Sequence, residues 1–111
     1  MGAASANALI EHIRRLVDPL GDRDVTDGQL LDRFTRHRDE GAFAVLVRRH
    51  GAMVLGACRH VLGQEQDAED AFQATFLVLA RKAGSIRQQS VAGWLFTVAR
   101  HLAARAFRAV L

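Results

Sequence analysis

Two short runs of the sequence gather residue types that perform acid–base chemistry or bind metals. Four carboxylates fall within six residues: Glu65, Asp67, Glu69 and Asp70. Just before them, Cys58 and His60 flank Arg59, a set with too few ligands for a zinc site. The acids lie at a predicted helix start, where the helix dipole favours them. There is no glycine-rich phosphate loop, and the five histidines are scattered. The sequence therefore predicts no enzyme, no metal site and no cofactor.

The helix predicted from Asp67 to Ala83 has an unusual polar face. Placing 100° per residue gives it a broad apolar arc: Ala68, Ala71, Phe72, Thr75, Phe76, Val78, Leu79 and Ala83. On the remaining arc, Glu69, Gln73 and Leu77 form one line along the surface, with Asp70 beside it. An acidic line that ends in an exposed leucine suits docking onto a basic helix of another protein. The alternative is that Leu77 packs under the N-terminal segment and the acids are merely solvated.

The helix predicted to begin at Ser90 has a basic face. Its core side is predicted to comprise Val91, Leu95, Val98, Ala99, Leu102, Ala106 and Ala109. The opposite side presents Trp94, Thr97, His101, Arg105 and Arg108. Arg100 stands on a neighbouring line between Phe96 and Phe107. Such groups can contact phosphates, base edges and unstacked bases. The alternative for Trp94 is a core anchor.

The loop before this helix adds hydrogen-bond donors next to a positive helix N-terminus: Ser85, Arg87, Gln88, Gln89 and Ser90. It forms a plausible pocket for a phosphate or an unstacked base. The charge distribution supports a polyanionic partner. The net charge is only +3, but no acid follows Asp70, whereas six basic residues do. The alternative is a basic, solvated face.

Five helices are predicted to position these faces, at about 7–17, 26–36, 39–62, 67–83 and 90–111, so the fold class is an all-α, compact helical bundle with an extra N-terminal helix. Thr26 and Gln29 have the spacing of a capping box. Asp39, Asp67 and Ser90 are predicted N-caps. We expect a left-handed Gly63 after the third helix and termination of the fourth at Gly84.

The apolar positions of the second and third helices predict the rest of the core: Leu30, Leu31, Phe34, Phe43, Leu46, Val47, Val54, Leu55, Cys58 and Leu62. Gly51 and Gly56 inside the third helix suggest close helix packing there. Half of the 111 residues are hydrophobic, which argues against wholesale disorder. No apolar run approaches the roughly 20 residues that span a bilayer. Since Cys58 is the only cysteine, the cytoplasm is the default compartment.

Four segments in this order resemble region 2 of the sigma-70 family, specifically of the extracytoplasmic-function (ECF) type: LLDRF (30–34), DEGAFAVLVRRHG (39–51), DAEDAFQATFLVLARKA (67–83) and SVAGWLFTVARHLAARAFR (90–108). The wording of the third segment is similar to sigma-like proteins of planctomycete-type bacteria. The resemblance covers residues 26–108, so we expect an N-terminal helix and linker at 1–25 and a region 2 domain at 26–111.

The resemblance implies that the fourth helix docks on the β′ clamp helices of core RNA polymerase. The residues that it puts at this interface are Asp67, Glu69, Asp70, Gln73 and Leu77. It also implies that the following loop and helix recognise the −10 promoter element and hold the melted non-template strand. By position, this implicates Arg87, Gln88, Gln89, Ser90, Thr97, Arg100, His101, Arg105 and Arg108, with Trp94 beside them. An anti-sigma factor is a further possible partner.

The sequence departs from the family pattern at His101, where members often have Asn, and at Arg105, where they often have Asp. These changes put the promoter sequence in doubt. The family's region 4, a helix-turn-helix, is absent from these 111 residues. We therefore expect either a fragment of a longer sigma factor or a region-2-only protein. A degenerate module that binds polymerase or a regulator without promoter-specific initiation remains the alternative function.

Overall fold

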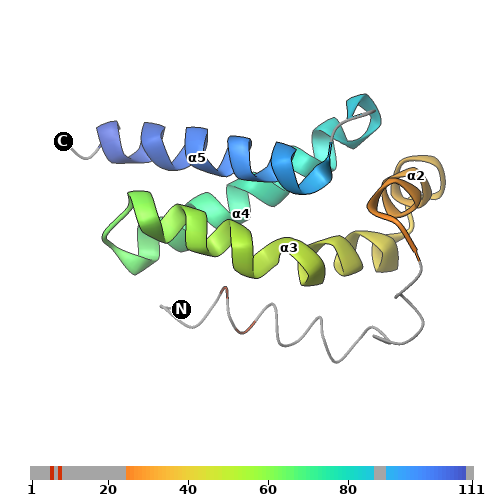
Figure 1. Cartoon of the computed structure of the whole chain (residues 1–111), viewed down its shortest axis with the longest axis horizontal. Coiled ribbons are helices and arrows are strands. Elements are labelled where there is room, and N and C mark those ends of the chain that lie inside the picture. Colours follow the sequence, from red (N-terminus) through yellow and green to blue (C-terminus); the bar gives the residue numbers. More distant parts are fainter. Residues whose placement is uncertain (1–5, 7, 9–24, 87–89, 110–111) are drawn as a thin grey trace.

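The computed structural model describes residues 6, 8, 25–86 and 90–109. These residues contain helices and no strand: α2 (Asp27–His37), α3 (Glu40–Val61), α4 (Glu65–Lys82), the 3₁₀ turn η1 (Ala83–Ser85) and α5 (Val91–Ala109) (Figure 1). The predicted all-α bundle is confirmed. The predicted N-terminal helix lies outside the described residues apart from Ala8, which is helical. None of the described helices is long and apolar enough to cross a membrane.

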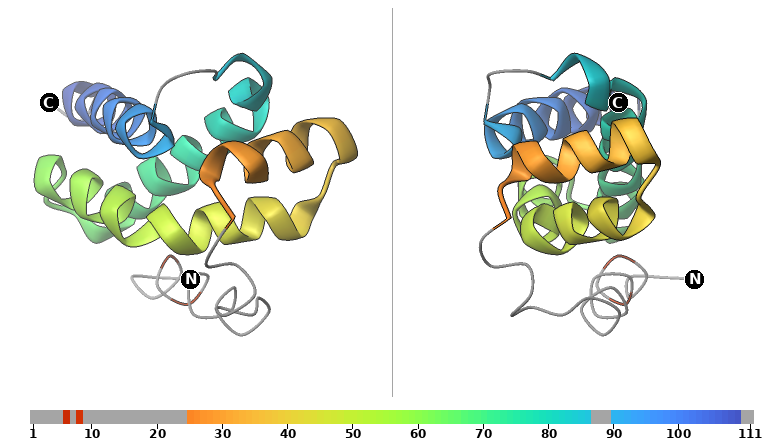
Figure 2. Two further views of the ribbon diagram at one scale, coloured as in Figure 1. Left: turned by 45° about the vertical axis from the view of Figure 1, so that its right-hand side comes forward. Right: turned by 90° about the vertical axis from the view of Figure 1, so that its right-hand side faces the viewer.

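Three long helices form the body of the bundle. Each of α3, α4 and α5 packs against the other two, while α2 packs against α3 and η1 at one end (Figures 1 and 2). The connection between α3 and α4 is short, so these helices form a hairpin. As a consequence, α4 contacts a helix on two flanks and leaves one narrow strip of its surface uncovered.

The N-caps of three helices lie where the sequence predicted them. Thr26 Oγ1 accepts a hydrogen bond from the Gln29 N–H at 3.1 Å, and Gln29 Oε1 accepts one from the Thr26 N–H at 2.8 Å, which completes a capping box. Asp39 accepts from the Ala42 N–H at 3.1 Å. Ser90 accepts from the Gly93 N–H at 3.3 Å through its hydroxyl. Each bond satisfies a donor that the first helical turn leaves open.

The predicted boundaries between α3 and α4 were wrong in two respects. Asp67 is not an N-cap, because α4 already begins at Glu65 after Gln64, whose side chain makes no capping hydrogen bond. Gly63 does not adopt a left-handed conformation. Instead, Leu62 ends α3 in an extended conformation and buries its side chain. The chain therefore turns by leaving the helix at a buried leucine, without a glycine cap.

The end of α4 also differs from the prediction. The helix stops at Lys82, and Gly84 lies in the middle of η1, which continues the chain without a left-handed residue. Among the described residues, the one non-glycine residue with positive φ is Arg38, at the end of α2. Its N–H donates to carbonyls of the last turn, and its guanidinium lies 4.9 Å from the Phe34 ring centroid.

The core agrees with the predicted apolar arcs at most positions. Buried residues come from every helix, among them Leu30, Leu31, Phe34, Leu46, Val47, Val54, Leu55, Cys58, Ala68, Ala71, Phe72, Thr75, Phe76, Leu79, Val91, Leu95 and Ala99. A row of aromatic rings joins three helices. Phe34 and Phe43 have centroids 4.8 Å apart, Phe43 and Phe76 6.5 Å, and Phe72 and Phe76 5.3 Å. Such pairs add about 0.5–1.5 kcal/mol each beyond their burial.

Several predicted core positions are less buried than expected. Ala109 is exposed, and Val98, Leu102 and Ala106 are half-buried. Gly51 is buried, but Gly56 is exposed, and a Cβ added there would meet no atom within 4 Å. The expectation of close helix packing at Gly56 was therefore wrong, since the solvent face of α3 passes through this residue.

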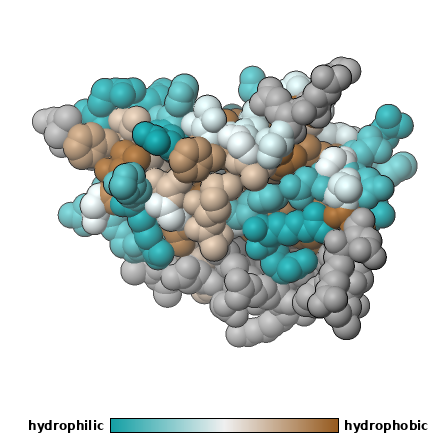
Figure 3. Space-filling model, in the orientation of Figure 1, coloured by the Kyte–Doolittle hydropathy of each residue, from teal (hydrophilic) through white to brown (hydrophobic). Residues whose placement is uncertain are grey.

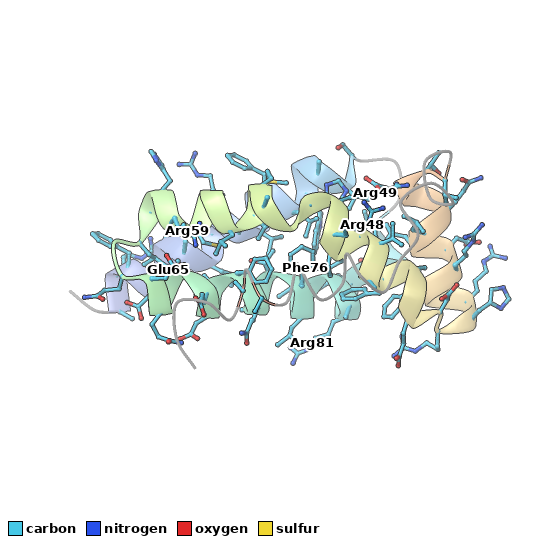
Figure 4. All side chains as sticks on the ribbon, turned by 90° about the horizontal axis from the view of Figure 1, so that it is seen from below. Arg48, Arg49, Arg59, Glu65, Phe76 and Arg81 are labelled. Atoms are coloured by element: carbon cyan, nitrogen blue, oxygen red, sulfur yellow. The ribbon has the colours of Figure 1, made fainter. Side chains whose placement is uncertain are left out.

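Two sets of ion pairs fasten the ends of α3 to its neighbours. At one end, Arg59 donates two hydrogen bonds to Glu65 across the hairpin, with Nε 2.9 Å from Oε1 (Figure 4). The hydrogen bond from Glu65 and its charge raise the pKa of Arg59, and the bond from Arg59 lowers the pKa of Glu65. Both side chains are solvated, so this pair contributes little stability.

At the other end, Asp27 in the first turn of α2 holds two cationic or polar groups of α3. Its Oδ1 lies 3.0 Å from Arg49 Nη1, and its Oδ2 lies 2.7 Å from His50 Nε2. The three side chains are only 13–26% exposed. Because both carboxylate oxygens are used in a half-buried place, this cluster fixes where α2 lies on α3.

We expect Asp27→Ala to lower the free energy of unfolding by about 1–3 kcal/mol, because it removes two charge-assisted hydrogen bonds and leaves Arg49 without that acceptor. The matched control is Asp32→Ala, also on α2. That change removes an exposed pair with Arg36 and should cost no more than about 0.5 kcal/mol. Urea denaturation measures both; equal losses would show that the Asp27 cluster does not fasten α2.

Candidate functional site

The structure corrects one residue of the predicted line on α4. Glu69 is completely buried rather than exposed. On a helix of 100° per residue, Glu69 lies only 20° from Phe76 but 40° from Gln73. It therefore belongs to the inward-facing line with Phe72 and Phe76, which packs towards α3. The charge of Glu69 also helps to raise the pKa of Arg59 on α3.

The uncovered strip of α4 consists of Gln66, Asp70, Gln73 and Leu77, which we call the α4 stripe. All four side chains are exposed, and their spacing of four, three and four residues keeps them on one face. Gln66 Nε2 donates to Asp70 Oδ1 at 3.2 Å. Leu77 is 60% exposed, so it is not packed against another part of the chain. The alternative in which Leu77 lies under the N-terminal segment is thereby excluded.

Asp67, the remaining acid predicted for this surface, lies at the border of the α4 stripe. Its side chain is half-buried and lines a groove between α4 and α5, together with Asp70, Ala71, Ala74, Leu102 and Ala106. Sequence projection placed the two helices separately and could not show that their alanines meet. Glu69 is therefore the one acid of the predicted set that the structure removes from the surface.

The basic face predicted for α5 is present. Five predicted polar residues are exposed: Thr97, Arg100, His101, Arg105 and Arg108. Two notches of about 330 and 220 Å³ lie between these side chains and share His101 and Ala104. The face can offer hydrogen-bond donors and positive charge, with space between them for flat groups.

Trp94 and the preceding loop have different outcomes. Trp94 is half-buried and packs against the core, so most of its ring serves as the core anchor that was the alternative prediction. Ser90 is exposed, but its hydroxyl accepts the Gly93 N–H as a helix cap. Arg87, Gln88 and Gln89 lie outside the described residues.

Two aromatic residues were missed as candidates for the site. Phe96 is 43% exposed and Phe107 is 44% exposed, both on α5. The guanidinium of Arg100 lies 5.7 Å from the Phe96 ring centroid. Their spacing around Arg100 was visible in the sequence, but apolar residues in a helix are usually assigned to its core. The surface in Figure 3 shows hydrophobic atoms exposed between hydrophilic ones on this side of the molecule.

A third surface feature joins the start of α5 to α2. A pocket of about 410 Å³ is bounded by Thr26, Leu31 and Thr35 of α2, by Gly84 and Ile86, and by Ser90 and Val91. The sequence predicted a pocket from the loop before α5 alone. It missed α2, because only the fold brings residues 26–35 beside η1.

No catalytic constellation appears among residues 25–86 and 90–109. Those residues contain no group of three or more His, Cys, Asp or Glu side chains that could hold a metal. Cys58 is buried, and burial raises the pKa of its thiol from 9.0 to about 11. A thiol in this state is a poor nucleophile at neutral pH. The exposed features are instead binding features: an amide–acid–leucine stripe, a basic aromatic face and shallow hollows.

The fold and these surfaces define an all-α binding domain with one acidic helix next to one basic helix. The family model for sigma-70 region 2 matches residues 46–110, which include most of α3 and all of α4, η1 and α5. This chain belongs to that family. No curated protein and no solved structure gives a significant match.

Membership assigns the domain to a family of non-enzymatic transcription initiation factors. The family implies interaction with core RNA polymerase and promoter DNA. It agrees with the order of segments that the sequence comparison emphasised, although the match starts at Leu46 and leaves α2 outside it.

We expect Cys58 to be unreactive in the folded protein. At pH 8 its reaction with a disulfide reagent such as DTNB should be about a hundredfold slower than in urea, because a pKa higher by two units lowers the thiolate fraction by that factor. Since the folded pKa is the higher one, the thiol stabilises the fold below pH 9, and this contribution is lost as the pH rises from about 9 to about 11. Equal rates with and without urea would contradict the burial.

Proposed function

We propose that this domain binds core RNA polymerase through the α4 stripe and holds the melted −10 promoter element through α5. The observation that carries the proposal is the 60% exposure of Leu77 within a polar, acidic strip on a family domain. An isolated exposed leucine is common on protein surfaces. A leucine in line with Gln73 and Asp70, on a helix otherwise covered on both flanks, has the composition of an interface anchor with a polar surround.

The partner of the α4 stripe is proposed to be the β′ clamp helices. Asp70 and the neighbouring Asp67 carry negative charge, while the stripe is about 11 residues long, or roughly three helical turns. This length and charge suit a basic helix laid along or across α4. Glu69 has no direct part in this contact, because its side chain is buried. Its role is to support α4 from behind.

Promoter DNA is proposed to lie on the exposed face of α5. Arg105 and Arg108 supply positive charge for phosphates, Thr97 and His101 supply hydrogen bonds, and Phe96 supplies a stacking surface beside Arg100. These groups bind a strand and break no bond. Contacts made only with the opened strand would offset the few kcal/mol that unstacking a base costs.

The finer classification also belongs to this proposal. The resemblance of residues 67–83 and 90–108 supports an ECF-type domain, with wording similar to sigma-like proteins of planctomycete-type bacteria. We propose that residues 26–111 form the region 2 domain, preceded by a helix and linker at 1–25, and that it acts in the cytoplasm, where polymerase and promoter are. An anti-sigma factor is a further proposed partner.

Leu77→Ala and Gln73→Ala should each weaken binding of the full chain to core RNA polymerase. For Leu77 we expect a loss of about 1–2 kcal/mol, or roughly 5- to 30-fold in Kd, because the change removes an interface anchor. Titration of core polymerase into fluorescently labelled protein measures the affinity.

The matched control for this titration is Phe107→Ala, which truncates another exposed apolar side chain on α5. It should leave polymerase affinity unchanged. Circular dichroism confirms that each variant is folded. If both α4 variants bind as tightly as the parent protein, the α4 stripe is not the polymerase interface.

Arg105→Ala and Arg108→Ala should weaken binding to single-stranded oligonucleotides carrying a −10-like sequence. Each lost phosphate contact should reduce the slope of log Kobs against log salt concentration by about 0.7. Fluorescence anisotropy over a series of salt concentrations measures both quantities.

Arg33→Ala, which removes an exposed arginine from α2, serves as the control and should change neither quantity. An unchanged affinity and salt slope in both α5 variants would place the DNA contacts elsewhere. Run-off transcription with core polymerase then separates promoter-specific initiation from polymerase binding alone. Polymerase binding without a promoter-dependent product would contradict the DNA half of the proposal.

A further inference from the structure

The groove between α4 and α5 is a second apolar feature next to the α4 stripe. It has a volume of about 250 Å³, with Ala71 and Ala74 of α4 facing Leu102 and Ala106 of α5. Ala74, Leu102 and Ala106 are half-buried, so the groove opens to solvent. Two carboxylates, Asp67 and Asp70, stand at its rim on the α4 side.

The groove exists because small side chains meet where two long helices pack. Alanines at these positions leave a hollow that a leucine at any one of them would occupy. Exposed apolar hollows next to a packed interface cost stability, since the side chains lining them lose contacts that a filled site would have. The rest of the contact between α4 and α5 is closed by larger residues such as Leu79 and Leu95, which are fully buried.

The size and the rim of the groove restrict what it can hold. Small-molecule sites usually have about 300–1,000 Å³, so this groove suits a single side chain better than a ligand. Two carboxylates at the rim repel phosphate groups, which makes nucleic acid an unsuitable occupant. An apolar side chain on a helix that also carries basic residues satisfies both the floor and the rim.

We propose that this groove receives one apolar side chain, of about leucine size, from the same basic polymerase helix that lies on the α4 stripe. The inference rests on the proposed function and extends it by assigning Leu102 and Ala106 of α5 to the polymerase interface. Asp70 is the physical link, because it belongs both to the α4 stripe and to the rim of the groove. The interface then has two anchor points, Leu77 pointing out of this domain and the groove receiving a side chain from the partner.

This arrangement has a consequence for α5. Its DNA-facing residues, Arg105 and Arg108, are close in sequence to Ala106, but they lie on another side of the helix. A polymerase side chain seated between α4 and α5 would therefore contact the helix that holds DNA without occupying its basic face. Polymerase and promoter can bind at the same time.

The test is Ala106→Leu, which fills the groove from α5 and leaves both the charge and the α4 stripe intact. The full chain with this change should bind core RNA polymerase at least tenfold more weakly than the parent. Its melting temperature should be equal or higher, because the new side chain packs against Leu102 and Ala71. The matched control, Ala52→Leu, adds the same atoms at an exposed position of α3 and should not change the affinity.

Ala74→Leu fills the groove from α4 and provides the measurement if Ala106→Leu proves unstable. Leu77→Ala is titrated in parallel to separate this inference from the proposed function. If Leu77→Ala weakens binding but the filled groove binds normally, polymerase docks on the α4 stripe alone and the groove inference is overturned. If the parent chain fails to bind polymerase, both are overturned. Loss of self-association with unchanged polymerase affinity would assign the groove to a second copy of the chain, which also overturns it.

Discussion

The packing of α4 between α3 and α5 is the constraint on which the surfaces of this domain depend. A helix with neighbours on two flanks must bury most of its circumference, and α4 does so with Ala68, Phe72, Phe76 and Leu79. One narrow strip remains, and its position is set by the two neighbours rather than by the polar residues themselves. The residues that happen to lie on that strip, Gln73 and Leu77 among them, are the ones that a partner can reach.

The same constraint explains why a buried carboxylate stands among the phenylalanines of α4. Glu69 lies towards α3, one turn after Glu65, which bonds Arg59 on that helix. The charge of Glu69 acts on Arg59 as well. The acids at the start of α4 are thus divided between two tasks. Glu65 and Glu69 attach α4 to α3 and stabilise its orientation, whereas Asp67 and Asp70 face the groove and the solvent.

Local sequence rules predicted the parts of the fold that depend on neighbouring residues. The capping box at Thr26 and Gln29 and the caps at Asp39 and Ser90 involve partners three residues away, so their pattern is visible in the sequence alone. The buried arcs were predicted for the same reason, since helical periodicity requires no tertiary information. The predicted resemblance to sigma-70 region 2 is confirmed by the family match.

The failures occurred where two elements meet. Glu69 was assigned to the surface because it is charged, although its angular position next to Phe76 indicated otherwise. Gly63 was expected to end α3 because glycine often does, but the burial of Leu62 determines where the chain turns. The contribution of α2 to the pocket near Ser90 depends on the contact between Asp27 and α3, which is 22 residues away in sequence. No local pattern reports such a contact.

The separation of charge along the sequence has a simple structural result. Every acid of the chain precedes residue 71, so α4 carries its acids at its start and α5 carries none. Because α4 and α5 are packed side by side, a surface suited to a basic protein helix lies next to one suited to a polyanion. The two partners would repel each other's sites, since phosphates are excluded by Asp67 and Asp70 and basic helices by Arg105 and Arg108. The order of charges in the sequence therefore directs each partner to its own helix while keeping both close together.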